Sequence, residues 1–274
     1  MTEQWMGEVI EGAFDAAVDG SWYQWLDFLR HSMGASGGML AHLGQPSALP
    51  IACGSDICGT AVNRYLTHRR QDPWYCLANS QPNQVTVLDG PMRLRRAHSD
   101  VADLCQQLQS HFHTGSVLSS DTGNILLTLH RGPDQCDFDP KQLQALSQVI
   151  GHLRSALAIT PLLFERVQQR LSAAQLADQQ HPQAVVRANG IPAFVNDRMR
   201  DYLQRQRHPF QYHQGRLGSS FPMLTRLIDQ AQRRACSSYQ RTSRVPLGDG
   251  LLQVTPLPES VLADAALWHI SPNS

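Results

Sequence analysis

The sequence predicts an α+β protein in which two small domains are joined by a long helix. Its 274 residues are enough for two domains of ordinary size. Strand-like and helix-like segments are mixed on both sides of a stretch that runs from residue 139 to about 180. In that stretch apolar residues recur at alternating steps of three and four. We therefore expect a first domain at 1–138, a helical connector at 139–182 and a second domain at 183–274.

Composition and charge limit the class of protein. The formal net charge is zero and the hydrophobic fraction is 42%, which is typical of a soluble globular protein. No apolar run is long enough to cross a membrane, and the N-terminus lacks a secretory signal, so we expect a cytoplasmic location. In that compartment the six cysteines are expected to be free thiols. The neutral charge argues against direct DNA binding by this chain.

The first domain is expected to contain a mostly antiparallel sheet. A turn at Asp121–Asn124 between two apolar segments is typical of a hairpin. Helices are expected at 4–17, 21–33, 60–70, 74–78 and 99–111, and strands at 39–43, 48–53, 85–88, 116–119 and 125–130.

The connector has a clear start signal and a change of character near its middle. Asp139 can accept hydrogen bonds from the first free N–H groups of a helix, and Pro140 suits its first position. Pro161 should kink or break the helix. Before it, the wide apolar stripe is expected to lie on the first domain's sheet. After it, a narrow stripe is expected to pair with a second copy of the chain, through Phe164, Val167, Leu171 and Ala174. Alternatively, both halves pack within one chain.

The second domain shows the element order of a PAS-type sensor domain. Two strands (184–187 and 191–195) precede a helix at 197–206 and a short hairpin around Gln214-Gly215. A helix at 221–236 and strands at 238–245, 251–256 and 265–270 follow.

Five segments together resemble the sensory region of bacterial LuxR-type helix-turn-helix regulators. They are AAVDGSWYQWLDFLRHSMGASGGML (16–40), RYLTHRRQDPWY (64–75), FDPKQLQALSQVIGHLRSALAI (138–159), AVVRANGIPAFVNDRMRDYL (184–203) and GRLGSSFPMLTRLIDQA (215–231). Their order and spacing extend the resemblance over nearly the whole chain. It implies a GAF-like domain, a helical connector, a PAS-like domain, homodimerisation and control of transcription.

The resemblance also raises a question about DNA binding. The family normally carries its helix-turn-helix segment just after the last PAS strand, whereas this sequence ends at Ser274. We expect DNA to be bound only through such a domain, which this chain does not contain. Either the chain is a shortened regulator, or it is a stand-alone protein that acts on a partner, for example as an antagonist in a heterodimer.

The segment Tyr65…Asp72-Pro73-Trp74 is the main candidate for a ligand site. An aromatic lining with one carboxylate suits a mostly apolar small molecule with an amide donor. In family members that sense acyl-homoserine lactones, a comparable Tyr and Asp contact the ligand's polar head, but the spacing here differs and that ligand is not predicted. The alternative is structural: Asp72 caps a helix, Pro73 begins it and Trp74 anchors the core.

Other clusters support weaker alternatives. Cys53 and Cys58, with His111 and His113 near Cys105, suggest a metal or redox sensor, although no Cys-x-x-Cys pair is present.

Two basic clusters suit either an anion or partner site or a solvated face. Their members are Arg64, His68, Arg69 and Arg70 in one, and Arg93, Arg95 and Arg96 in the other.

Motifs of catalysis and of nucleotide binding are not found, so we expect no enzymatic activity, cofactor or bound metal. The sequence thus predicts a sensory, homodimeric module of a LuxR-type regulator that binds a small-molecule or protein signal.

Overall fold

The computed structural model divides the chain into two compact units, Met1–Thr160 and Pro161–Ser274. It describes residues 3–43, 52–57, 59–97, 99, 101–120, 123–170, 180–204, 210–213, 216–237, 241–248, 250–258 and 262–272. Within these ranges no helix combines the length and apolar character needed to span a membrane. The α+β class expected from the sequence is confirmed.

The first unit is built on a five-stranded antiparallel sheet with the strand order β2-β1-β5-β4-β3. Its strands are β1 (Gly37–His42), β2 (Ala52–Ser55), β3 (Thr86–Val87), β4 (Phe112–Ser120) and β5 (Gly123–Arg131). Its helices are α1 (Glu3–Asp19), α2 (Trp22–Ser32), α3 (Gly59–His68), η1 (Arg69–Gln71, a 3-10 turn), α4 (Pro73–Ser80), α5 (Gly90–Ala97) and α6 (Ala102–Gln107).

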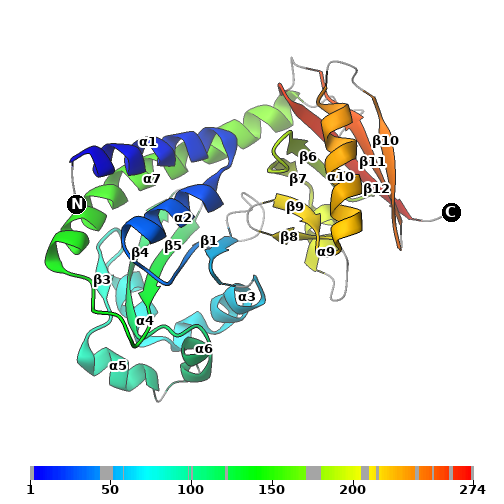
Figure 1. The fold of residues 1–274 in the computed structure, drawn as a ribbon. Coiled ribbons are helices and arrows are strands. Elements are labelled where there is room, and N and C mark those ends of the chain that lie inside the picture. The colour runs from blue at the N-terminus through cyan, green and yellow to red at the C-terminus, as the bar shows by residue number, and fades with distance from the viewer. Residues whose placement is uncertain are drawn as a thin grey trace. The chain divides into compact units, whose positions relative to one another are not determined.

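Helices cover both faces of this sheet (Figure 1). On one face, Gly38 of β1 and Leu129 of β5 lie beside Leu26 of α2, and α1 lies on the same side. On the other face, alternate residues of the same strands, such as Met39 and Leu126, share a buried core with α3, α4 and α6. This second face carries the site described below.

The structure corrects three details of the first domain. The helix α5 was not predicted, because Gly90-Pro91 resembled a loop. In fact Asp89 Oδ1 accepts a hydrogen bond from the Met92 N–H, 2.8 Å away, and proline is tolerated in a first helical turn. The helix expected at 99–111 is shortened to α6, and β4 begins at Phe112, where its ladder with Arg131 of β5 begins.

The helix α7 (Pro140–Arg170) begins where the sequence predicts. Asp139 Oδ1 accepts from the Gln142 N–H and Gln142 Oε1 accepts from the Asp139 N–H, which is a reciprocal capping box. Leu146 and Leu153 in its first half are completely buried. The helix is not broken at Pro161, although the division into two units falls at the Thr160–Pro161 bond.

The predicted pairing seam lies mostly outside the described part of the chain. Phe164 and Val167 belong to the helical backbone of α7, but their side chains are not described. Leu171 and Ala174 lie in 171–179, outside the described residues. Homodimerisation and the domain boundaries at 138/139 and 182/183 therefore stay predictions.

The second unit contains a five-stranded antiparallel sheet with the strand order β10-β11-β12-β6-β7, and a two-stranded ribbon, β8-β9. Its elements follow the predicted order: β6 (Gln183–Arg187), β7 (Pro192–Val195), α9 (Asp197–Gln204), β8 (Phe210–His213), β9 (Arg216–Ser219), α10 (Pro222–Ala235), β10 (Ser243–Leu247), β11 (Gly250–Pro256) and β12 (Ala265–Pro272). The names GAF-like and PAS-like remain expectations from the resemblance.

Large side chains fill the covered face of the second sheet. Phe210 and Trp268 are completely or almost completely buried, with ring centroids 5.5 Å apart. Among the described residues of this core, the amide of Gln232 on α10 is a buried polar group. It donates to the carbonyls of Val186 and Arg187 and accepts from Trp268 Nε1. This amide is uncharged, and it both donates and accepts hydrogen bonds.

Candidate functional site

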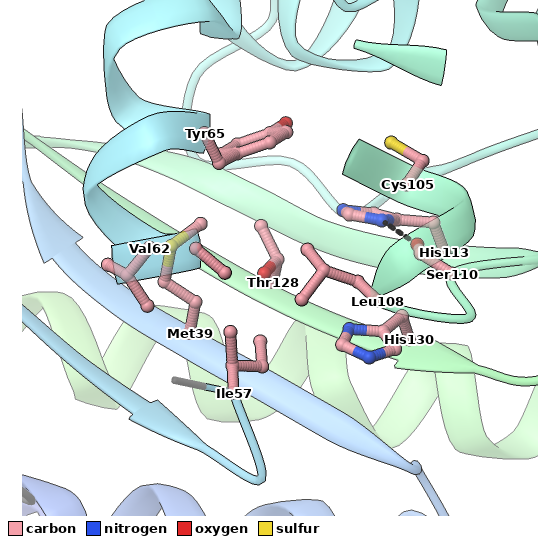
Figure 2. A pocket seen from close by; sticks show the side chains of 11 residues that line it. Met39, Ile57, Val62, Tyr65, Cys105, Leu108, Ser110, His113, Thr128 and His130 are labelled. Atoms are coloured by element: carbon pink, nitrogen blue, oxygen red, sulfur yellow. Dashed lines mark hydrogen bonds between the residues drawn. The ribbon is translucent and has the colours of Figure 1, made fainter. Parts of the chain in front are cut away.

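A small cavity lies in the first unit, between the sheet and the helices α3 and α6 (Figure 2). Its volume is about 20 Å³, which is room for roughly one water molecule. Most of the wall is apolar. The lining residues are Met39, Ile57, Ala61, Val62, Tyr65, Cys105, Leu108, Ser110, His113, Thr128 and His130.

A buried ion pair between Asp72 and Arg96 lies next to this cavity, in contact with the lining residues Tyr65 and His113. Asp72 is completely buried and Arg96 of α5 is 4% exposed. Arg96 Nε donates to Asp72 Oδ1 at 3.0 Å, and Arg96 Nη2 donates to Oδ2 at 2.6 Å. This is the two-pronged geometry in which arginine binds a carboxylate most strongly. Burial alone would lower the pKa of Arg96, but the Asp72 carboxylate outweighs it and raises that pKa.

Two further groups complete the hydrogen bonding of Asp72. Its Oδ1 also accepts from the Trp74 backbone N–H at 3.0 Å, and its Oδ2 accepts from the Tyr65 hydroxyl at 2.7 Å. A carboxylate offers about four acceptor positions, and all four are used. The pKa of Tyr65 is raised well above its usual value by burial and by the Asp72 charge, so this hydroxyl remains a donor.

The structure brings the three predicted ligand residues together, but in different roles. Tyr65 lines the cavity, whereas Asp72 and Trp74 are not among the lining residues. Asp72 is the N-cap of α4 with Pro73 in its first turn, as the structural alternative predicted. Trp74 is completely buried and donates from Nε1 to the Thr86 carbonyl. Ligand contact by these residues stays a prediction.

Arg96 is the residue whose role the sequence did not reveal. Sequence reasoning placed it in a basic cluster with Arg93 and Arg95, with a solvated face as one of two interpretations. Its partner Asp72 lies 24 residues earlier, and the helix that presents Arg96 was not predicted. No local spacing connects the two residues, so only the folded chain shows the pair.

His113 of β4 joins the ion pair to the cavity. Its Nδ1 lies 3.4 Å from Arg96 Nη1 and 3.0 Å from Ser110 Oγ. Its ring packs against the Trp74 ring, with centroids 4.3 Å apart. Burial, the positive charge of Arg96 and the neighbouring His130 all lower its pKa well below the usual value, so the ring is neutral near pH 7. Its Nε2 is buried without a hydrogen-bond partner.

His130 of β5 forms the adjacent part of the wall. A β-carbon at residue 37 would collide with the His130 imidazole, so Gly37 of β1 lets the ring lie across the sheet. Burial lowers the pKa of His130 to about 4, with a further contribution from Arg96. The next residue, Arg131, projects from the opposite face and donates to the carbonyls of Cys136 and Asp137, just before α7.

The metal and redox alternatives gain no support from the described residues. No group of three or more His, Cys, Asp or Glu side chains is close enough there to hold a metal ion. Cys105 lines the cavity, but burial raises its pKa to about 11, so its thiol stays protonated and poorly reactive. The Cys53 side chain and Cys58 lie outside the described residues.

Comparisons with known proteins leave the family open. No family model and no curated protein matches the sequence. Among solved structures, the Escherichia coli DhaR(N)–DhaL complex aligns with 11% identity and a TM-score of 0.29, over 100% of this chain and 91% of that chain. A sensor region of a sensor histidine kinase aligns with 12% identity and a TM-score of 0.28, over 95% and 91%. TM-scores this low do not show a shared fold, so neither structure assigns a function to this chain.

Proposed function

We propose that the first unit senses a small molecule in the cavity beneath α3 and α6. The observation that supports this most is His113, a buried polar group with an unpartnered nitrogen in a mostly apolar wall. Burying a polar group without a partner costs about 1–3 kcal/mol, and a ligand would remove that cost. We further propose, from the resemblance, that the chain is the sensory and dimerisation module of a LuxR-type regulator.

The proposed role is binding and not catalysis. Asp72 has no acceptor position left, so it is unsuited to take a proton from a substrate. The lowered pKa of His113 keeps it far from the range in which a general base works best near neutral pH.

The strand β5 supplies a route from the cavity to the connector. Thr128 and His130 line the cavity, and Arg131, the next residue along, holds the segment that leads into α7. Arg131 Nη2 also donates to the Gln142 side chain in the first turn of that helix, at 3.2 Å. We propose that ligand binding displaces β5 and thereby the start of α7.

Ligand binding is tested by filling the cavity. Ala61→Leu adds three carbons at the wall, while Ala102→Leu adds the same volume to a half-buried alanine of α6 that does not line the cavity. The purified proteins are extracted, and co-purified small molecules are compared by mass spectrometry. We expect a molecule bound to the wild type and to Ala102→Leu but absent from Ala61→Leu. Equal recovery from all three proteins would contradict binding in this cavity.

Homodimerisation is tested separately by light scattering. The backbone of α7 remains helical through Arg170, and Leu162 is 58% exposed next to the predicted seam. We expect the wild type and a control, Gln169→Asp at an exposed position, to be dimers at micromolar concentration. Val167→Asp should be a monomer, because a buried unpaired carboxylate is costly. A monomeric wild type would overturn the pairing seam.

A further inference from the structure

Whether the unpartnered ring nitrogen of His113 donates or accepts a hydrogen bond indicates which kind of molecule fits the cavity. His113 is 5% exposed, and its ring lies among the apolar side chains that line the cavity (Figure 2). Its Nε2 is the buried atom of the lining without a partner. Whether this atom donates or accepts depends on the tautomer of the ring.

Arg96 sets that tautomer. A guanidinium has only donors, and two of its nitrogens, Nη1 and Nη2, lie 3.4 and 3.5 Å from His113 Nδ1. Nδ1 is therefore assigned as the acceptor, because an N–H in that position would face two further N–H groups, whereas the Ser110 hydroxyl, 3.0 Å away, can donate to it. Since the ring is neutral, its single proton lies on Nε2. The cavity thus contains an unused N–H donor.

The charges around the cavity disfavour an ionic ligand. The positive charge of Arg96 is already balanced by the two-pronged pair with Asp72. The described lining residues include no lysine or arginine, so an anion would find no free counter-charge among them, and a cation would lie close to Arg96. A charged group buried without a partner is far more costly than a neutral one. A neutral acceptor therefore suits the His113 N–H.

We propose that the cavity takes an uncharged, mostly apolar molecule that accepts one hydrogen bond from His113 Nε2–H through a carbonyl-type oxygen. This proposal rests on the proposed binding function. It differs from the sequence-based expectation, in which the ligand donates a hydrogen bond, because here the ligand accepts one. A ligand that donates to Asp72 has no acceptor position to use, whereas a ligand that accepts from His113 satisfies a buried donor. The cavity must widen on binding, and the flexible side chain of Met39 in its wall suits this adjustment.

The experiment compares two probes of the same shape, cyclohexanone and methylenecyclohexane, on the full chain. Only the ketone has an acceptor oxygen. Dissociation constants are measured by NMR on protein with 15N-labelled histidine, for the wild type, His113→Phe and the control His152→Phe, at an exposed histidine of α7. The probes differ in hydration, but this difference is common to all three proteins and cancels when the ketone-to-alkene ratio is compared between them.

We expect His113→Phe to weaken ketone binding relative to alkene binding by about tenfold, the value of one buried hydrogen bond. His152→Phe, the same change at a histidine that does not line the cavity, should keep the wild-type ratio. If both probes bind and the ratio is unchanged in His113→Phe, the inference fails while small-molecule binding stands. If neither probe binds the wild type, both fail.

The wild-type protein provides a readout that does not depend on a variant folding. Two-bond couplings between ring protons and ring nitrogens distinguish the histidine tautomers. We expect His113 to carry its proton on Nε2, and the Nε2–H signal to move with cyclohexanone more than with methylenecyclohexane. A proton on Nδ1 would contradict the proposal that His113 Nε2–H donates to the ligand.

Discussion

The two units have sheets with the same strand order but cores with different contents. Counted along the chain within each five-stranded sheet, the strands lie side by side in the order second, first, fifth, fourth and third. The first unit buries a charged pair, two neutral histidines and a cavity. The second unit buries aromatic rings around the Gln232 amide, which has three described hydrogen bonds and a contact to Cys236. The same sheet topology therefore supports one core that holds a buried charged pair and a cavity, and another that holds aromatic rings around a hydrogen-bonded amide.

Breaking the ion pair should give the largest difference between the units. In Arg96→Met the Asp72 carboxylate stays buried without its counter-charge, so the first unit should lose about 3–5 kcal/mol of unfolding free energy. The second unit should be unaffected. Urea denaturation followed by amide hydrogen exchange measures the two units separately, which is necessary because a chain with two units need not unfold in one step.

A matched double variant distinguishes lost charge balance from lost packing. Asn at residue 72 keeps an oxygen for the Trp74 N–H, so Asp72→Asn/Arg96→Met should be more stable than Arg96→Met alone. A loss below about 1 kcal/mol in Arg96→Met would mean that the pair is not desolvated, and the contrast between the two cores would disappear.

Acidification should also act mainly on the first unit. His113 and His130 have lowered pKa values in the fold, so between pH 6.5 and about 4 the unfolded chain binds more protons than the folded one. Stability is thus complete above pH 6.5 and falls as the pH decreases. For His130, a pKa lowered from 6.5 to about 4 corresponds to a loss of about 3 kcal/mol.

The pH dependence is measured from the urea midpoint of the first unit between pH 7 and pH 4. His130→Gln should flatten the profile, because glutamine does not titrate. His152→Gln, at an exposed histidine of α7, is the control and should leave the slope as it is. An unchanged slope in His130→Gln would show that this ring is not responsible.

The smallest expected effect belongs to the second unit. Gln232→Leu leaves Trp268 Nε1 and two carbonyls without their partner, at a cost of about 1–3 kcal/mol confined to that unit. Gln230→Leu, at an exposed position of the same helix, should be within about 0.5 kcal/mol of the wild type. A destabilisation by Gln232→Leu as large as that by Arg96→Met would abolish the difference between the cores.

Local sequence signals predicted much of the fold. The start of α7 at Pro140 was predicted because Asp139 can accept hydrogen bonds from free N–H groups of the first turn and proline suits its first position. The hairpin of β4 and β5 and the element order of the second unit were also predicted, since turns and apolar periods extend over only a few residues. The helix α5 was missed because its Gly-Pro start resembles a loop.

The α+β class, the long helix between two sets of strands and the N-cap role open to Asp72 follow from local sequence patterns. The charge that Asp72 meets and the histidine nitrogen that lacks a partner become visible only in the folded chain, because the residues involved are far apart in sequence. Caps and periods act within a few residues, whereas the contact between Asp72 and Arg96 and the position of His113 beside them arise when the sheet and its helices pack and exclude water.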